Sequence, residues 1–372
     1  MPMAYRIPLL FALPLLAACS GSDVDPEDGA RAALAAGDYP AARTYLAEAL
    51  RDSPSDPDLL ELLARVRLGL ADGDATIATL NRLAAVGRLP KDAALLYAEA
   101  ELQRDAPEEA LHRLADDDSA AAWRIRALAA IRQEDREQAG QAFLAGTRAP
   151  GPKSELYVNY AYFLLEDDNL VGARHAVNAT MAERGDAIDS MLLDARVSQR
   201  EGRNSDALKR YREILTRFPG HRDALLGAIS VLGEAGQIAE VEKLVAQGVA
   251  NAPGDPEFTY LTARLAAEKQ DWVAVRRTLQ PAEMSLSDFP EASALYSQAM
   301  LEMGQAEQAR ARLVGLLRND PDNALVRRLY ARALLALKDN AEARIVIEPL
   351  ATGEDATSED LELYRRAGQA GM

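Results

Sequence analysis

The stretch DALKRYREILTRFP, residues 206–219, decides the fold of this 372-residue chain. It is amphipathic with a helical period, and its small Ala207 and large Tyr211 fall on the apolar face. Proline lacks the backbone donor of a helix and clashes with the preceding turn, so we expect the helix to end before Pro219. The stretch predicts one amphipathic helix that packs closely against its neighbours.

The same markers return along the chain in steps of 34 residues or multiples of 34. They are Pro219, Pro253 and Pro321; Gly202, Gly236 and Gly304; and Ala139, Ala173, Ala207, Ala309 and Ala343. Together they define seven gapless units, which start at Ala120, Ser154, Ile188, Arg222, Pro256, Pro290 and Ala324. A fixed period of this length predicts a chain built from stacked supersecondary units.

Each unit reads as a helix, a turn and a second helix. The turns are EGRN at 201–204, EAGQ at 234–237 and EMGQ at 302–305. Small residues at the eighth position (Ala195, Ala263, Ala331) and at the twentieth let the two helices approach. The large residue at the twenty-fourth position, as in Phe143, Tyr211 and Leu313, fills the gap toward the next unit.

These spacings resemble the tetratricopeptide repeat (TPR), and Trp123 at the fourth position of its unit adds to the match. Upstream, DYPAARTYLAEALRDSP at 38–54 gives another second helix, whereas 57–90 and 91–119 match less well. The resemblance implies an all-α, right-handed superhelical solenoid of about ten helix–turn–helix units. It also implies a concave groove that binds a protein or peptide.

Three departures from the repeat predict local irregularities. The unit at 91–119 is five residues short and ends in Asp116, Asp117 and Asp118, whose repulsion disfavours a helix and predicts a break between two arrays. Pro281 falls inside a second helix, which should stop early or kink. After Thr357, SEDLELYRRAGQ predicts a capping helix with a cap at Ser358 and with Leu361, Tyr364 and Ala367 on its buried face.

The first residues are expected to be a targeting segment. Residues 7–16 are apolar but far shorter than the ~20 residues of a spanning helix, and LAAC follows directly. This resembles the lipobox of bacterial lipoproteins, which implies cleavage before Cys19 and its acylation, for example with palmitate. Ser20 replaces the aspartate typical of inner-membrane retention, so the resemblance implies the outer membrane, with the protein facing the periplasm. An ordinary signal peptide with an incidental cysteine is the alternative.

The predicted organisation follows from these features. It comprises a signal peptide at 1–18, an acylated tether at 19–28, degenerate repeat units at 29–119, seven in-register units at 120–357, and a capping helix and tail at 358–372.

The composition argues against several classes of function. With 42 basic and 58 acidic side chains the formal charge is −16, and no basic cluster appears, which disfavours nucleic-acid binding. Three histidines and one cysteine are too few to suggest a metal site, and no cofactor motif is present, so we expect neither a metal nor a cofactor. His221-Arg222-Asp223 has the letters of a kinase catalytic loop but lacks its companion motifs.

The leading hypothesis is a non-enzymatic scaffold or assembly lipoprotein of an envelope machine. It is similar in build to TPR lipoproteins of pilus biogenesis and of exopolysaccharide export or exosortase systems. A second hypothesis is an adaptor that docks periplasmic proteases or peptidoglycan hydrolases. A hypothesis of another class is an enzyme with an unrecognised site in 57–119.

The candidate partner-binding residues come from groove positions of the TPR framework. They are Tyr162, Arg196, Arg200, Tyr260, Arg264, Arg328 and Arg332. Three of the arginines recur at 68-residue steps, so one interpretation is a positive stripe that grips carboxylates of an acidic or C-terminal peptide. The other interpretation is an ordinary charged surface that nearby Asp and Glu residues neutralise.

Overall fold

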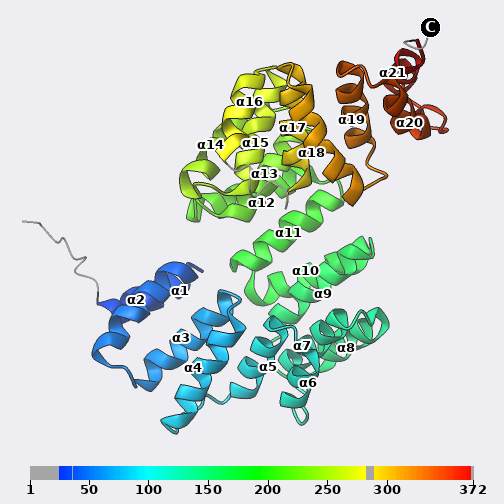
Figure 1. The fold of residues 1–372 in the computed structure, drawn as a ribbon. Coiled ribbons are helices and arrows are strands. Elements are labelled where there is room, and N and C mark those ends of the chain that lie inside the picture. Colours follow the sequence, from blue (N-terminus) through cyan, green and yellow to red (C-terminus); the bar gives the residue numbers. More distant parts are fainter. Residues whose placement is uncertain (1–24, 36, 282–288, 370–372) are drawn as a thin grey trace, which may run out of the picture. The chain divides into compact units, whose positions relative to one another are not determined.

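The structure is a computed structural model that describes residues 25–35, 37–281 and 289–369 (Figure 1). Within these ranges the chain forms helices and no strand, and the helices follow one another as antiparallel pairs. The predicted all-α repeat architecture is confirmed. The predicted signal peptide, Cys19 and the first part of the tether lie outside the described residues.

The described helices form ten pairs and one terminal helix, which confirms the expected number of units. The first helices of the pairs are α1 (Pro26–Ala35), α3 (Pro57–Gly69), α5 (Ala93–Gln103), α7 (Ala120–Arg132), α9 (Ser154–Glu166), α11 (Ile188–Arg200), α13 (Arg222–Glu234), α15 (Pro256–Glu268), α17 (Pro290–Glu302) and α19 (Ala324–Ala336). The second helices are α2 (Tyr39–Asp52), α4 (Gly73–Ala85), α6 (Pro107–Arg113), α8 (Arg136–Arg148), α10 (Leu170–Arg184), α12 (Asn204–Arg217), α14 (Ile238–Asn251), α16 (Trp272–Leu279), α18 (Ala306–Asn319) and α20 (Asn340–Ala351). The chain then forms α21 (Ser358–Gln369). All seven predicted unit starts coincide with the first residue of a first helix.

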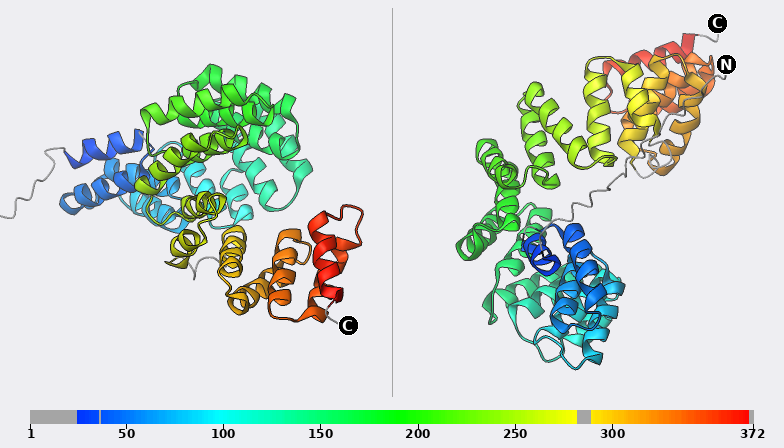
Figure 2. Two further views of the ribbon diagram at one scale, coloured as in Figure 1. Left: turned by 90° about the horizontal axis from the view of Figure 1, so that it is seen from above. Right: turned by 90° about the vertical axis from the view of Figure 1, so that its left-hand side faces the viewer.

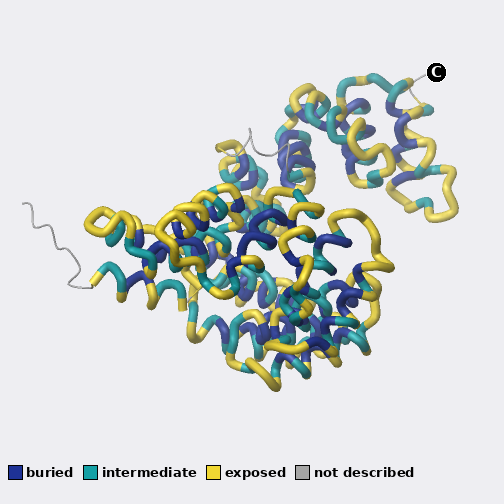
Figure 3. The backbone as a smooth tube through the Cα atoms, turned by 90° about the horizontal axis from the view of Figure 1, so that it is seen from below, coloured by how far each residue is buried: buried dark blue, intermediate teal, exposed yellow. Residues whose placement is uncertain are grey.

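The repeat markers occupy the contacts between helices. The alanines at the eighth and twentieth positions, such as Ala195 and Ala207, have no exposed surface. The large residues Phe143, Tyr211 and Leu313 are also fully or almost fully buried. Helices that follow one another in sequence lie side by side (Figure 2). Buried residues lie along the helices, and exposed residues gather at the turns (Figure 3). The core is therefore a row of similar helix contacts rather than one central cluster.

The chain divides into two compact units, residues 1–159 and 160–372, with the boundary inside α9. The predicted break near Asp116 does not coincide with this boundary. Residues 114–118 are indeed non-helical, but the core continues past them, because Leu114 packs in one buried cluster with Ile125 of α7. Arg126 of α7 also donates a hydrogen bond of 2.8 Å to the Leu114 carbonyl.

Two predictions about the ends of the array need correction. Residues 26–28, assigned to the tether, belong to α1, because Pro26 suits the first turn and Glu27 and Asp28 favour its positive end. At the other end Thr357 caps α21 in place of Ser358: its hydroxyl oxygen accepts a hydrogen bond of 3.3 Å from the Asp360 N–H, and its backbone N–H donates to the Asp360 carboxylate.

The buried face of α21 also differs from the prediction. Leu363 and Ala367 are buried and Tyr364 packs against the core, but Leu361 is 52% exposed. The prediction for Pro281 is confirmed, since α16 ends at Leu279 after eight residues. No helix in the described ranges is both long and apolar enough to cross a membrane.

Close helix approach makes one glycine sensitive to substitution. A Cβ added to Gly227 of α13 would lie 2.2 Å from the ring of buried Tyr211, whereas one added to Gly233 of the same helix meets nothing within 4 Å. We expect Gly227→Ala to lower the free energy of unfolding by about 1–3 kcal/mol through overpacking. Gly233→Ala should be neutral or stabilising by up to about 1 kcal/mol, because alanine favours the helix. Urea unfolding followed by circular dichroism measures both, and equal effects would contradict this account of helix spacing.

Candidate partner-binding cavities

The first helices of the second compact unit line two cavities. One, here called the α9–α13 cavity, has a volume of about 550 Å³. It is lined by Tyr162, Leu165, Glu166, Arg196, Gln199, Arg200 and Glu234. The other, the α15–α19 cavity, has a volume of about 500 Å³ and includes Tyr260, Arg264, Glu268, Trp272, Glu291, Leu295, Gln298, Leu325 and Val326 in its lining. Both volumes lie in the range of ligand-binding pockets.

The basic groups of the α9–α13 cavity are held by interactions within the protein. The Arg196 guanidinium donates to Asp223 at 2.9 Å and lies 5.4 Å from the centre of the Tyr162 ring. Burial raises the pKa of the Tyr162 hydroxyl, and the Arg196 charge opposes this rise only in part. Arg200 donates to Asp168 at 2.9 Å. These contacts join neighbouring repeats and hold the side chains in place.

The side-chain amide of Gln199 is also hydrogen-bonded within the protein. Gln199 donates to the Ser230 hydroxyl at 3.0 Å and to the Glu234 carboxylate at 3.4 Å. The lining of the α9–α13 cavity is therefore a preformed, internally bonded surface.

The predicted arginines near the C-terminus are also paired. Arg328 donates two hydrogen bonds to Asp360, at 2.7 and 2.9 Å, and Asp360 is 1% exposed. These hydrogen bonds hold the Asp360 pKa well below its usual range despite the opposing effect of burial. Arg332 donates to Glu302 at 2.6 Å. Both arginines bind acidic groups of neighbouring helices.

The α15–α19 cavity differs in this respect. Arg264 lines it beside Tyr260, and no ion pair or hydrogen bond of its guanidinium occurs in the part of the chain that the structure describes. The predicted candidates are thus divided: Tyr162, Arg196 and Arg200 line one cavity, and Tyr260 and Arg264 line the other. Arg328 and Arg332 line neither. Their roles in partner binding stay predictions.

The repeat geometry agrees with a comparison of sequences. The profile of the tetratricopeptide repeat matches residues 33–91, 199–265, 266–332 and 300–356, which together exceed half of the chain. The chain belongs to the tetratricopeptide repeat family.

Solved structures agree in fold. A TPR protein from Parabacteroides merdae is 14% identical, with a TM-score of 0.50, and the match covers 67% of this chain and 99% of that one. The human IFIT1 dimer with m7Gppp-AAAA is 12% identical, with a TM-score of 0.54 and coverage of 93% and 81%. At these identities the likeness concerns the fold alone.

One curated relative matches part of the sequence. It is cellulose synthase operon protein C of Pseudomonas fluorescens (strain SBW25), 33% identical over 140 residues. The match covers 35% of this chain but only 11% of that protein, so the chain spans about a tenth of the relative's length.

One TPR feature of the second unit was not anticipated from sequence. Trp272 stands at the start of a second helix, α16, yet lines a cavity of first helices. The groove positions predicted from sequence all lie on first helices. An aromatic residue directly after the interhelix turn is the signal that points to it, because this place lies beside the end of the preceding first helix.

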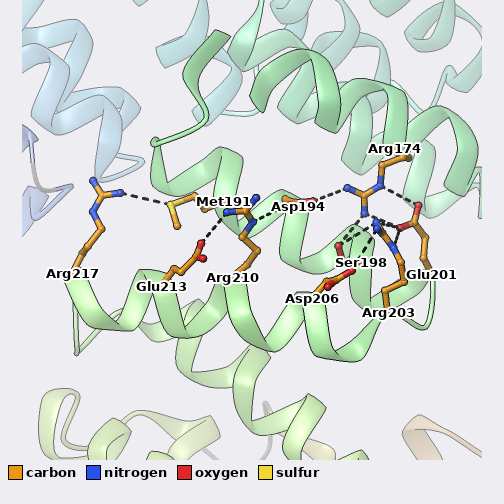
Figure 4. A network of polar contacts seen from close by, with 10 residues as sticks. All are labelled: Arg174, Met191, Asp194, Ser198, Glu201, Arg203, Asp206, Arg210, Glu213 and Arg217. Carbon is orange, nitrogen blue, oxygen red and sulfur yellow. Dashed lines mark hydrogen bonds and ion pairs between the residues drawn. The ribbon is translucent and has the colours of Figure 1, made fainter. Parts of the chain in front are cut away.

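A charged network joins three TPR helices of the second unit (Figure 4). Arg174 of α10 donates to Asp194 at 2.6 Å and to Glu201 at 2.7 Å, and Arg210 of α12 donates to Asp194 at 2.8 Å. Burial opposes ionisation of Asp194, but hydrogen bonds from both arginines outweigh it and lower its pKa. The hydrogen bond from Arg174 lowers the pKa of Glu201. The network therefore stabilises the stacking of repeats in its charged form.

This network predicts a pH-dependent contribution to stability. The folded-state pKa of Asp194 is lowered, so its contribution is complete above the unfolded carboxyl pKa of about 4 and disappears as the pH falls through the folded value. We expect Asp194→Asn to lower the free energy of unfolding by about 1–3 kcal/mol at pH 7, and by progressively less as the pH falls toward 3. Asp206→Asn is the control, because Asp206 is 59% exposed and lies 3.6 Å from Arg203. A difference between wild type and Asp194→Asn that does not change with pH in urea titrations contradicts this role.

Proposed function

We propose that this TPR protein is a lipid-anchored scaffold that holds protein partners of an envelope machine at the periplasmic face of the outer membrane. The observation that carries the binding role is the preformed α9–α13 cavity. Its Arg196, Gln199 and Arg200 are already oriented by neighbouring repeats, so a partner loses little side-chain entropy on binding. Partner binding is also the usual task of this family.

The anchor is proposed from the N-terminal sequence. LAAC at 16–19 follows a short apolar stretch and contains the sole cysteine of the chain. Several acyl chains on one residue give stable membrane attachment where a single chain is marginal. Such an anchor keeps the solenoid close to partners embedded in the same membrane.

The type of machine is proposed from the partial relative. The name of that relative links it to cellulose synthesis, and 140 residues of this chain match it at 33% identity. This favours exopolysaccharide export over pilus biogenesis, because no comparable sequence match supports the latter. An adaptor that docks periplasmic proteases or peptidoglycan hydrolases stays an alternative proposal, and no contact in the two cavities favours it. An enzyme site in 57–119 stays the other alternative, and neither cavity includes a residue of that segment.

Acylation has a direct test. We expect a fatty-acid analogue to label the wild-type protein, and Cys19→Ser to lose the label and to leave the outer-membrane fraction. The physical reason is that the Cys19 thiol is the proposed attachment point of the acyl chains. Equal labelling of both proteins, or a wild-type protein free in the periplasm, would end the lipoprotein proposal.

The scaffold role is tested by crosslinking in intact envelopes followed by affinity purification. Arg200→Glu places a negative charge in the α9–α13 cavity, and we expect it to reduce partner recovery severalfold while changing unfolding free energy by less than about 1 kcal/mol. Lys209→Glu is the matched control, since Lys209 is an exposed cation on the second helix α12, outside both cavities. Recovery that is unchanged by Arg200→Glu, or reduced equally by both variants, contradicts docking in this cavity.

A further inference from the structure

The α15–α19 cavity combines hydrogen-bond donors and acceptors that have no partner among the residues that the structure describes. Arg264 is a donor, Glu268 and Glu291 are acceptors, and Gln298 is both. None of these side chains forms a hydrogen bond or ion pair within residues 25–35, 37–281 and 289–369. Side chains of Arg196, Arg200 and Gln199 in the α9–α13 cavity are all bonded, so the two cavities differ in what they leave for a ligand.

The same cavity has an aromatic and apolar lining. Tyr260 of α15 and Trp272 of α16 both line it, together with Leu295 and Leu325. Leu325 is 53% exposed, although a large aliphatic side chain gains free energy when it leaves water. A ligand for this cavity must therefore offer an apolar face to the rings and many hydrogen-bonding groups to the rim.

The charged groups of this cavity argue against a strongly acidic or a strongly basic peptide as its ligand. An acidic segment that reaches Arg264 also meets Glu268 and Glu291, and a basic segment that reaches these carboxylates meets Arg264. A like charge brought into a partly desolvated site is unfavourable. A hydroxyl group avoids this conflict, because it donates to a carboxylate and accepts from a guanidinium.

We propose that the α15–α19 cavity binds a segment of a polysaccharide chain. The C–H face of a sugar ring packs against Trp272 and Tyr260, and its hydroxyls bond to Arg264, Glu268, Glu291 and Gln298. The inference rests on the proposed function, because a protein of an exopolysaccharide machine encounters polysaccharide. The glycan would be a second kind of ligand, bound at a different cavity from the one proposed for the protein partner.

The test uses the tryptophan of the cavity as a reporter. The chain has two tryptophans, so Trp123→Phe leaves Trp272 as the sole indole. The full chain with this substitution is titrated with cellohexaose, hexagalacturonate and chitohexaose, which distinguish a neutral, an acidic and an acetamido glycan. We expect a saturable change of Trp272 fluorescence with at least one of them, and calorimetry on the wild type should give the same affinity.

Two variants assign the binding to this cavity. Trp272→Ala should weaken binding about tenfold through the loss of stacking. Because Trp272 also packs against the core, Glu268→Ala is the second variant: it removes an exposed, unpaired acceptor, should weaken binding severalfold and should leave helicity unchanged. Glu354→Ala, at an exposed glutamate outside the cavity, is the matched control and should bind as the wild type does.

The possible outcomes separate this proposal from the previous one. No saturable binding of any of the three glycans, or binding that survives both Trp272→Ala and Glu268→Ala, overturns the glycan site. A purified partner protein could instead change the Trp272 fluorescence while none of the glycans binds. That result would assign the cavity to a protein ligand and would also overturn the glycan site. If no glycan binds but partner recovery still depends on Arg200, only the glycan site is overturned. If glycans bind but partner recovery does not depend on Arg200, only the scaffold role is contradicted.

Discussion

The close approach of helices at alanine and glycine positions is the constraint on which the rest of this structure depends. Ala195 and Ala207 have no exposed surface, and Gly227 brings α13 against the Tyr211 ring. A larger side chain at these places would move the next helix outward. Because each repeat contacts only its neighbours, such a displacement passes directly to the cavities that the following first helices line.

Charge pairing between repeats is the second determinant, and it decides what the cavities offer to a partner. Arg196 with Asp223, and Arg200 with Asp168, each join residues of different repeats. The paired arginines orient the cavity without leaving a free positive field, which agrees with the neutralised-surface interpretation better than with a positive stripe. In a chain of net charge −16, these paired arginines leave shape and hydrogen bonding as the main features that the α9–α13 cavity presents.

The sequence predicted what depends on local chemistry and periodicity. Every in-register unit began at the expected residue, and Pro281 shortened α16, because both follow from helix period and backbone sterics. The exposure of Leu361 and the core that continues past Asp116 depend on side chains from other helices. The cap of α21 is local, and the prediction placed it one residue too late, at Ser358 in place of Thr357. The partners of the groove arginines are of this second kind, since 27 to 32 residues separate them in sequence.

Two equivalent pairs of positions show why the site itself required the structure. Arg196 is followed 27 residues later by Asp223, and Arg264 is followed 27 residues later by Glu291. The first pair forms a hydrogen bond of 2.9 Å, whereas the second pair leaves both charged groups lining an open cavity beside Trp272. The same repeat position therefore serves stability in one unit and is left available in another. This inequality between equivalent positions distinguishes a candidate ligand site from the surface of the scaffold.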